Sequence, residues 1–287
     1  MKLGISSYSL HRALGEGGTT IVDLVQWVAD NGGEHIEIVP IGFSLDEDPR
    51  LAERIRRKAE EVGIDISNYA IGATFLQPDK DSYRNEIDRV KRQVDIAHTL
   101  GTSHMHHDIG SRPIPESTIQ NFNRDLPLFV EACREVADYA SQYNMTTSVE
   151  NHGYYVQASD RLQALVSAVD RPNFRTLLDV GNFMCADEDS VTAVKKNLPI
   201  ASMIHLKDFH LRPGNRDYGE GFFPTLGGNL LRGTIVGQGD IDQHEVIRLI
   251  KQSGYQGYIS IEYEGHGPCY YGSKVGMDNA RRMWNEA

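Results

Sequence analysis

Short runs of strand-forming apolar residues alternate with amphipathic helical stretches along the chain, and this alternation constrains the fold more than any other feature. Strands are predicted near residues 3–8, 35–39, 64–71, 103–108, 146–150, 175–179, 202–205 and 258–263. Helical patterns separate them, for example over 19–31 and 82–100. Such alternation favours parallel strands with crossover helices, in an open doubly wound sheet or a closed barrel.

The length of the repeating pattern favours the barrel. Eight strand–helix units in about 265 residues match a (β/α)8 barrel, which often uses about 250 residues as one domain. The G-x-G-x-x-G loop of many dinucleotide-binding open sheets does not follow the first strand. We therefore predict an α/β fold, a single TIM-barrel domain over residues 1–287.

One segment, residues 208–241, breaks the alternation. It contains several glycines and the aromatic residues Tyr218, Phe222 and Phe223. A loop of this length inside a compact domain is usually functional or disordered. We expect a lid-like insertion over a site, with a packing flap as the alternative.

Four of the predicted strands end in side chains that can bind a metal. The runs T-T-S-V-E, R-T-L-L-D, S-M-I-H and S-I-E end in Glu150, Asp179, His205 and Glu262. A buried ionisable group without a partner costs several kcal/mol, so we expect these four to share one function. The carboxyl ends of barrel strands meet at one rim, where TIM-barrel active sites lie.

Three carboxylates and one imidazole form a ligand set of mostly hard donors. This set suits one divalent ion, Mn²⁺, Mg²⁺, Co²⁺ or Zn²⁺, with positions left for two substrate oxygens. The ion would polarise a carbonyl and stabilise a developing enediolate. Glu150 and Glu262 come from strands on opposite sides of the rim, so we predict that they exchange the proton as a catalytic pair. Each residue alone could instead be an ordinary salt-bridge partner.

Several residues next to these endings are candidates for substrate binding. His152 follows Glu150, and Lys207 follows His205, where it either neutralises charge near the metal or pairs with a carboxylate. Glu37 ends the second strand and is a candidate for a hydroxyl contact. Strand four carries His106 and His107 on opposite faces, so at least one should face the rim; we select His107.

The overall charge argues against a nucleic-acid partner. The chain has 29 basic and 40 acidic residues, a net charge of −11, whereas nucleic-acid binders usually carry a basic surface. The N-terminus lacks a signal-peptide pattern and no apolar stretch reaches about 18 residues, so we expect no membrane association. Three dispersed cysteines indicate a reducing compartment, and we expect a cytoplasmic protein. The expected partner is a small carbohydrate; a homo-oligomer is left open.

The motifs S-V-E-N-H-G, L-L-D-V-G-N, I-H-L-K-D, I-V-G-Q-G-D-I-D and Y-I-S-I-E-Y-E resemble the sugar phosphate isomerase/epimerase family, with its xylose isomerase-like TIM barrel. Its relatives include ketose 3-epimerases and inosose isomerases and dehydratases. The resemblance covers nearly the whole chain. It implies a Mn²⁺-type site at the four strand endings and proton exchange by Glu150 and Glu262.

Two positions depart from the ketose 3-epimerase pattern. Asn182 stands where those enzymes carry a histidine, and Leu211 stands where they carry an arginine, with Arg212 one residue later. We expect Asn182 and Arg212 to contact the substrate, which need not be a free ketohexose. The leading hypothesis is a metal-dependent isomerase or epimerase of a keto-sugar or cyclic polyol ketone. The alternative is a lyase, an inosose dehydratase or a 3-keto-glycoside β-eliminase. Less favoured are an endonuclease IV-like DNA-repair enzyme and a non-catalytic sugar-binding or partner-regulated member of the fold.

Overall fold

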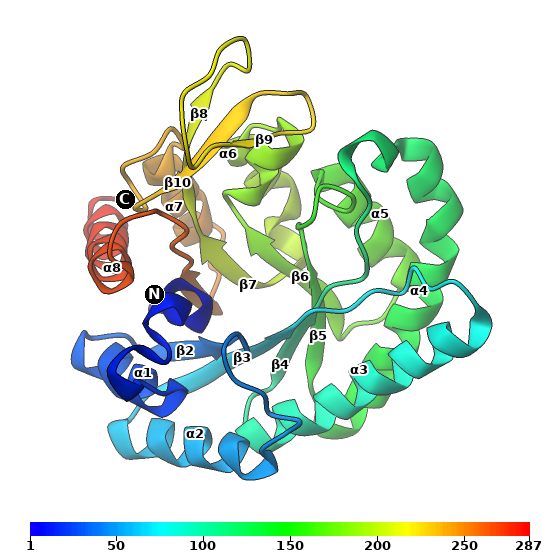
Figure 1. Ribbon diagram of the computed structural model, residues 1–287, viewed down its shortest axis with the longest axis horizontal. Helices are drawn as coiled ribbons and strands as arrows, with labels where there is room; N and C mark the ends of the chain where they lie inside the picture. The colour runs from blue at the N-terminus through cyan, green and yellow to red at the C-terminus, as the bar shows by residue number, and fades with distance from the viewer.

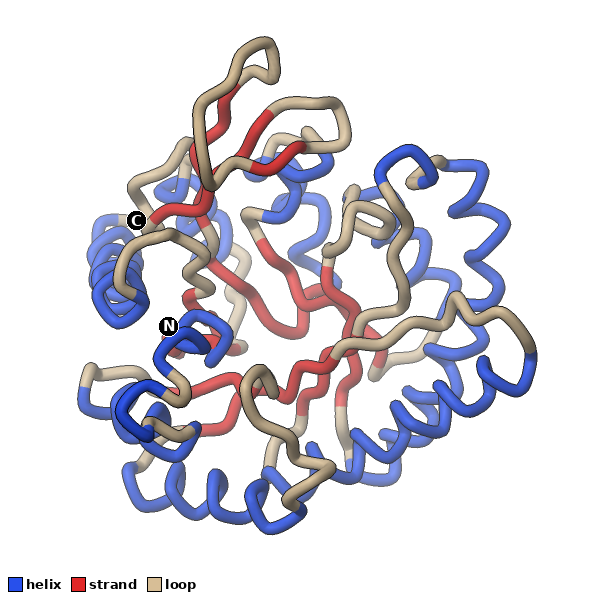
Figure 2. Tube along the Cα trace, viewed as in Figure 1, coloured by secondary structure: helices blue, strands red, loops and turns tan.

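The computed structural model is a closed parallel barrel surrounded by helices (Figures 1 and 2). It describes the backbone of residues 1–287 and every side chain but that of Pro49. In this described chain, eight strands close in the order β1-β11-β7-β6-β5-β4-β3-β2. They are β1 (Lys2–Ser6), β2 (His35–Ile38), β3 (Asp65–Ile71), β4 (His104–His107), β5 (Thr146–Glu150), β6 (Phe174–Asp179), β7 (Ala201–Leu206) and β11 (Tyr258–Ile261). The predicted (β/α)8 barrel is confirmed.

The α-helices lie outside the strands, as Figure 2 shows in blue around the red ring. They are α1 (Ile21–Asp30), α2 (Pro49–Val62), α3 (Lys80–Leu100), α4 (Ile119–Ala140), α5 (Ser159–Val169), α6 (Ser190–Asn197), α7 (Gln243–Gln252) and α8 (Cys269–Glu286). Polar residues start several of them: the Thr20 hydroxyl accepts from the Asp23 N–H while the Asp23 carboxylate accepts from the Thr20 N–H. Such a capping box satisfies backbone donors that the first helical turn leaves free. Within the described chain, no helix is both long and apolar enough to cross a membrane.

The sequence analysis does not predict α8, which contains Gly272 and Gly276. Packing explains both glycines. A Cβ on Gly272 would lie 2.3 Å from the Tyr263 ring, and one on Gly276 would lie 3.1 Å from Ile261. The glycines therefore let α8 pack closely against the end of β11, which offsets their low helix propensity.

The insertion contains regular structure, which the sequence analysis does not predict. Three antiparallel strands, β8 (Asp208–Arg212), β9 (Phe223–Pro224) and β10 (Leu230–Thr234), form a small sheet in the order β8-β10-β9 within the described residues. This sheet projects beyond the rim of the barrel at the top of Figure 1. Its turn is anchored to the barrel because Asp187 accepts hydrogen bonds from Thr225 and Asn229, at 2.7 and 2.9 Å.

The chain returns to the barrel through the G-Q-G-D segment, which is held by Asp208. The Asp208 carboxylate accepts backbone N–H groups of Phe209, Gly237 and Gly239, at 2.9–3.1 Å. Gly239 is required by space, because a Cβ there would lie 2.1 Å from Asp208 Oδ1. The I-H-L-K-D and G-x-G-D motifs are thus two halves of one contact.

We expect Gly239→Ala to lower the free energy of unfolding by about 1–3 kcal/mol, because the methyl group overlaps the Asp208 carboxylate. Urea unfolding measures the change. Gly72→Ala is the matched control, since a Cβ on Gly72 meets only Asp108 Oδ2, at 4.0 Å; its expected change is within about 0.5 kcal/mol. Equal stability of the two variants would contradict this role of Asp208.

Candidate metal centre and active site

The four strand-end residues meet at one point inside the rim. The ligand atoms of Glu150, Asp179, His205 and Glu262 all lie within 4.8 Å of one another, and all four residues are buried. His205 Nδ1 faces the three carboxylates, at 3.8 Å from Glu150, 3.9 Å from Asp179 and 3.5 Å from Glu262. The structure thus brings together the residues that the sequence singled out as metal ligands.

The turn after β6 orients the Asp179 carboxylate. Its Oδ1 accepts the backbone N–H groups of Gly181 and Asn182, each at 2.8 Å, which leaves Oδ2 facing the cluster. Asn151 joins the ends of β5 and β6, because its side chain donates to the Asp179 carbonyl and accepts from the Asp179 N–H. Gly181 allows the turn to pass Lys207, whose Cβ would lie 2.9 Å from an added methyl group.

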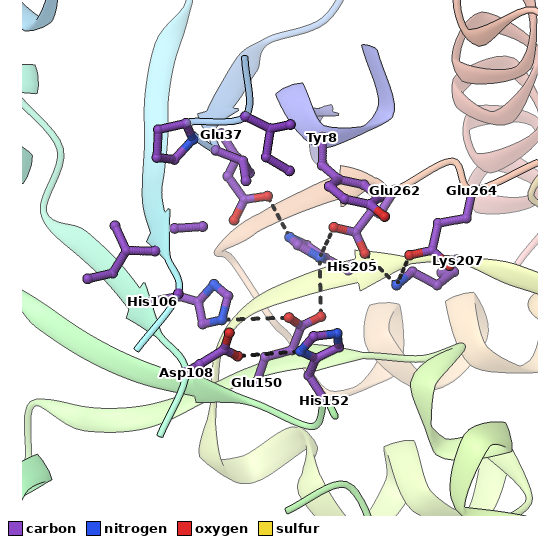
Figure 3. Close-up of a pocket in the computed structure, with 16 residues that line it drawn as sticks. Tyr8, Glu37, His106, Asp108, Glu150, His152, His205, Lys207, Glu262 and Glu264 are labelled. Atoms are coloured by element: carbon purple, nitrogen blue, oxygen red, sulfur yellow. Dashed lines mark hydrogen bonds and ion pairs between the residues drawn. The ribbon is translucent and has the colours of Figure 1, made fainter. Parts of the chain in front are cut away.

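Glu37 contacts the imidazole of His205 at Nε2, the ring nitrogen opposite the one that faces the cluster (Figure 3). Its Oε2 lies 2.8 Å from His205 Nε2, and its Oε1 accepts from Asn68 Nδ2 at 2.7 Å. Glu37 also lines the pocket, so its contact with a substrate hydroxyl stays a prediction beside this contact with His205. A carboxylate at Nε2 keeps the proton there and leaves the Nδ1 lone pair for a metal, a common arrangement behind metal-binding histidines.

Lys207 provides a cation at the edge of the cluster. Its Nζ lies 2.6 Å from Glu262, 3.2 Å from Asp179 and 3.1 Å from Glu264. Asn182 connects Lys207 to Glu150, since its side chain donates to Glu150 Oε1 at 3.1 Å and accepts from Lys207 at 3.2 Å. This buried amide thus bridges Glu150 and Lys207, and its contact with a substrate stays a prediction.

The carboxylates outnumber the cations that face them. Burial, followed by the charge of Glu262, raises the pKa of Glu150 to about 8, and burial raises the pKa of Asp179 to about 6. Burial also disfavours the charged form of Glu262. The positive charges of Lys207 and His205 together have the larger effect, so the pKa of Glu262 is lowered. Such opposed shifts arise where acidic groups compete for too little positive charge.

The donor set fits a divalent cation. Among the described residues, His205 Nδ1 is buried without a hydrogen-bond partner and faces the three carboxylates, and Asp179 Oδ2 is buried beside it with no hydrogen bond, only the Lys207 ammonium at 3.2 Å. An unpartnered buried polar atom is costly, and coordination of a cation would satisfy both. Oxygen donors and an imidazole suit several divalent ions, and the donor set does not select one.

His152 and Asp108 form a second pair at the mouth of the pocket (Figure 3). His152 Nδ1 lies 3.4 Å from Asp108 Oδ1, and the His152 side chain is 55% exposed. The hydrogen bond to Asp108 raises the pKa of His152. The sequence analysis does not select Asp108, although it directly follows β4, as Glu262 follows β11. Glu264 was also missed; it follows Glu262 by two residues.

Two expected substrate contacts lie elsewhere. His106, rather than His107, lines the pocket, with Nε2 at 3.6 Å from Glu150. His107 is on the opposite face of β4, where its ring packs near Phe75 and Phe174. Arg212 lies on the outer strand β8 and pairs with Asp240 at 2.9 Å, so the chain carries it away from the rim.

The pocket above the cluster has a volume of about 240 Å³. Glu150, Glu262, His205 and Lys207 line one part of it, and one wall is apolar. The apolar wall consists of Val39, Pro40, Ile41, Ala70 and Ile71. A polar floor with one apolar wall is typical of small-molecule sites, in which a few polar groups set the orientation of the ligand.

Comparison with known proteins agrees with this geometry. The family model described as "Xylose isomerase-like TIM barrel" matches residues 25–287. The chain belongs to this family. The resemblance inferred from the sequence motifs is therefore confirmed.

Relatives in the xylose isomerase-like family are enzymes that act on small sugar-like compounds. An inosose dehydratase from Bacillus velezensis is 29% identical over 130 residues, 44% of this chain and 42% of the relative. One from Clostridium perfringens matches over 46% of its length, so the chain spans about half of these dehydratases. A putative hydroxypyruvate isomerase from Homo sapiens is 20% identical over 258 residues, 84% of each chain.

Solved structures share the fold at low identity. A probable 3-DHS dehydratase from Bacillus anthracis has a TM-score of 0.76 at 20% identity, over 97% of this chain and 98% of that one. A 3-keto-D-glucoside 4-epimerase from E. coli has a TM-score of 0.74 at 12% identity, over 98% and 99%. The IOLI protein, whose structure contains a zinc atom, has a TM-score of 0.71 at 19% identity, over 100% and 97%.

We expect excess Mn²⁺ to raise the thermal midpoint of the metal-free protein, because a ligand that binds only the folded state stabilises it. Asp179→Asn should abolish this rise, since the amide replaces a ligand oxygen while its carbonyl can still accept from the turn. Asp240→Asn, at an exposed ion pair, is the control and should respond like the wild type. Calorimetric titration gives the stoichiometry. An unchanged rise in Asp179→Asn would place the ion elsewhere.

Proposed function

We propose that this chain is a divalent-metal-dependent enzyme that moves a proton on the carbon beside a carbonyl, as an isomerase or epimerase of a keto-sugar or cyclic polyol ketone. The observation that carries the proposal is the placement of Glu150 and Glu262. Both carboxylates line the pocket, and both face the same nitrogen of His205, at 3.8 and 3.5 Å. A ligand in this pocket therefore lies within reach of two proton-accepting groups.

The protein residues have distinct roles in this proposal. A bound divalent ion would act as a Lewis acid that polarises the substrate carbonyl and lowers the cost of removing the neighbouring proton. Glu150 or Glu262 accepts that proton on a carboxylate oxygen, and the other carboxylate returns a proton to a different carbon or face. Lys207 keeps Glu262 in place, and Asn182 does the same for Glu150.

The charge and size of the pocket support a small neutral substrate. Its lining includes the carboxylates of Glu37, Asp108, Glu150, Glu262 and Glu264, against Lys207 and the imidazoles of His152 and His205. A bound divalent ion and the raised pKa of His152 would offset much of this negative charge, so the loaded pocket gives no advantage to a strongly charged substrate. A volume of about 240 Å³ lies below the range of roughly 300–1,000 Å³ common for drug-sized ligands, which suits one small ring.

We expect Glu150→Gln and Glu262→Gln each to lower kcat by about 10²–10⁴-fold, because each variant removes a group that transfers the proton. Turnover would be followed on a panel of keto-sugars and inososes with the metal-loaded enzyme. Glu245→Gln, at an exposed ion pair with Arg248 on α7, is the matched control and should keep normal activity. Near-normal turnover by either site variant would refute the paired proton transfer.

A dehydratase is the second candidate, favoured by the His152–Asp108 pair. In this reaction Glu150 or Glu262 removes the proton beside the carbonyl, and the hydroxyl group on the next carbon leaves. His152 would donate the proton with which that hydroxyl departs as water, while Asp108 holds the imidazole at 3.4 Å. The similarity to inosose dehydratases supports this candidate.

Product mass in deuterated water separates the two candidates. An isomerase or epimerase should give a product of unchanged composition that carries solvent deuterium at the reacting carbon, whereas a dehydratase should give a product that has lost one water. In the dehydratase case, His152→Ala should slow the release of water far more than it slows proton exchange at the carbon beside the carbonyl. If the enzyme catalysed neither exchange nor water loss with any ketone of the panel, both candidates would fail.

A further inference from the structure

A second cavity adjoins the pocket above the metal cluster. It has a volume of about 280 Å³ and lies between the turn Ser7–Ala13, the insertion and the loop after β11. Tyr8 and Glu264 line both cavities, so the two meet at these side chains. In Figure 3, Tyr8 and Glu264 lie on the Glu262 side of the pocket, away from His106 and Asp108.

A third cavity, of about 400 Å³, continues the second one outward. The two share Tyr263, His266 and the glycines between them, and the third ends between Glu220 and Arg232 of the insertion. The three cavities therefore adjoin one another in a row that starts beside Glu262. We call the part beyond Tyr8 and Glu264 the outer groove.

Two glycines of the insertion lie where the insertion touches the loop after β11. A Cβ on Gly233 would lie 2.5 Å from the carbonyl oxygen of Glu264, and one on Gly221 would lie 2.5 Å from His266 Nε2. The insertion thus approaches the loop after β11 as closely as a backbone without side chains allows. These contacts bound the groove at two points and fix the insertion against the loop after β11.

The lining of the outer groove suits a neutral ring. Aromatic rings of Tyr8, His11, Phe223, Tyr263 and His266 line the second cavity. Aromatic faces pack well against the C–H faces of sugar rings and of other rings, while their polar edges contact hydroxyl groups. These residues therefore suit a ring with both apolar faces and hydroxyl groups.

The charges of the outer groove give no preference for an anion. Its inner part contains one guanidinium, Arg12, and one carboxylate, Glu264; its outer part contains Arg232 and Glu220. Arg12 already donates to the carbonyl oxygens of Gly265 and Gly267, at 2.7 and 3.0 Å. Because each part of the groove has one cation and one carboxylate, a phosphate group would gain little electrostatic attraction here.

We propose that the outer groove binds the second, non-reacting ring of a neutral two-ring substrate, a glycoside whose keto-sugar ring occupies the first pocket. The assignment of the reacting ring rests on the proposed function. The first pocket holds one small ring, and the outer groove continues from it on the Glu262 side. A single-ring ketone such as an inosose would leave the outer groove empty.

Binding of phenyl α- and β-D-glucoside tests the subsite without turnover. Saturation-transfer NMR on the metal-loaded protein should show contact at both the sugar and the phenyl protons of at least one anomer. Phe223→Ala and His266→Ala should each weaken binding on the order of 3- to 10-fold, as expected for loss of one aromatic contact. Phe223 packs against Phe209, so the exposed His266 provides the variant least able to disturb the fold.

Two matched controls separate the groove from general effects of substitution. Tyr218→Ala removes another aromatic ring of the insertion, which lines neither cavity of the groove, and His244→Ala removes an exposed histidine of α7. Both should bind the glucosides like the wild type. Absence of binding by the wild type, or equal binding by groove and control variants, overturns the subsite.

Kinetics distinguishes failure of the subsite from failure of the proposed function. The metal-loaded enzyme should have a higher kcat/KM for a phenyl 3-keto-D-glucoside than for free 3-keto-D-glucose. Phe223→Ala and His266→Ala should raise KM for the glucoside alone. If Glu150→Gln is inactive but Phe223→Ala and His266→Ala change KM equally for the glucoside and the free keto-sugar, the subsite is refuted and the proposed function stands. Full activity of Glu150→Gln refutes the proposed function, and the NMR result then decides the subsite.

Discussion

Three buried carboxylates that face one imidazole nitrogen are the constraint on which the rest of this site depends. Their oxygens and His205 Nδ1 lie within 4.8 Å of one another, in a part of the barrel shielded from water. Each uncompensated buried charge costs several kcal/mol, and Lys207 and His205 offset only part of the negative charge. Glu37 adds a further carboxylate at His205 Nε2. A divalent cation is the simplest group that would balance this set.

The surrounding polar contacts hold these side chains in position. The turn after Asp179 binds one of its oxygens and leaves the other free for the cluster, and Asn151 ties that turn to the neighbouring strand. Asn182 spans Glu150 and Lys207 on the other side. Ligands fixed in this way lose little conformational freedom on binding an ion, which favours tight binding and a defined substrate orientation.

The barrel and the cluster could be predicted from the sequence because both follow from local rules. Strand–helix alternation gives parallel strands, and the carboxyl ends of parallel strands meet at one rim. Each metal-site residue ends or directly follows its strand, apart from His205, which is followed by one more strand residue. The positions of these residues along the chain were therefore sufficient to bring them together.

Other features depend on contacts between distant segments. Glu37 reaches His205 across the interior of the closed barrel, which strand order alone does not reveal. Alternation along β4 predicts two faces but not which face is inward, so His107 was chosen where His106 lines the pocket. The insertion sheet and α8 depend on close approaches at glycines, and glycine in a sequence indicates a break as readily as a tight contact.

The most direct measurement is anomalous X-ray diffraction at the manganese edge, on crystals of the Mn²⁺-loaded protein. The account predicts one anomalous peak among Glu150, Asp179, His205 Nδ1 and Glu262, with Glu37 still bound to His205 Nε2. A peak at another place would contradict it. So would the absence of a peak at full Mn²⁺ loading, with Lys207 still paired to Asp179 and Glu262.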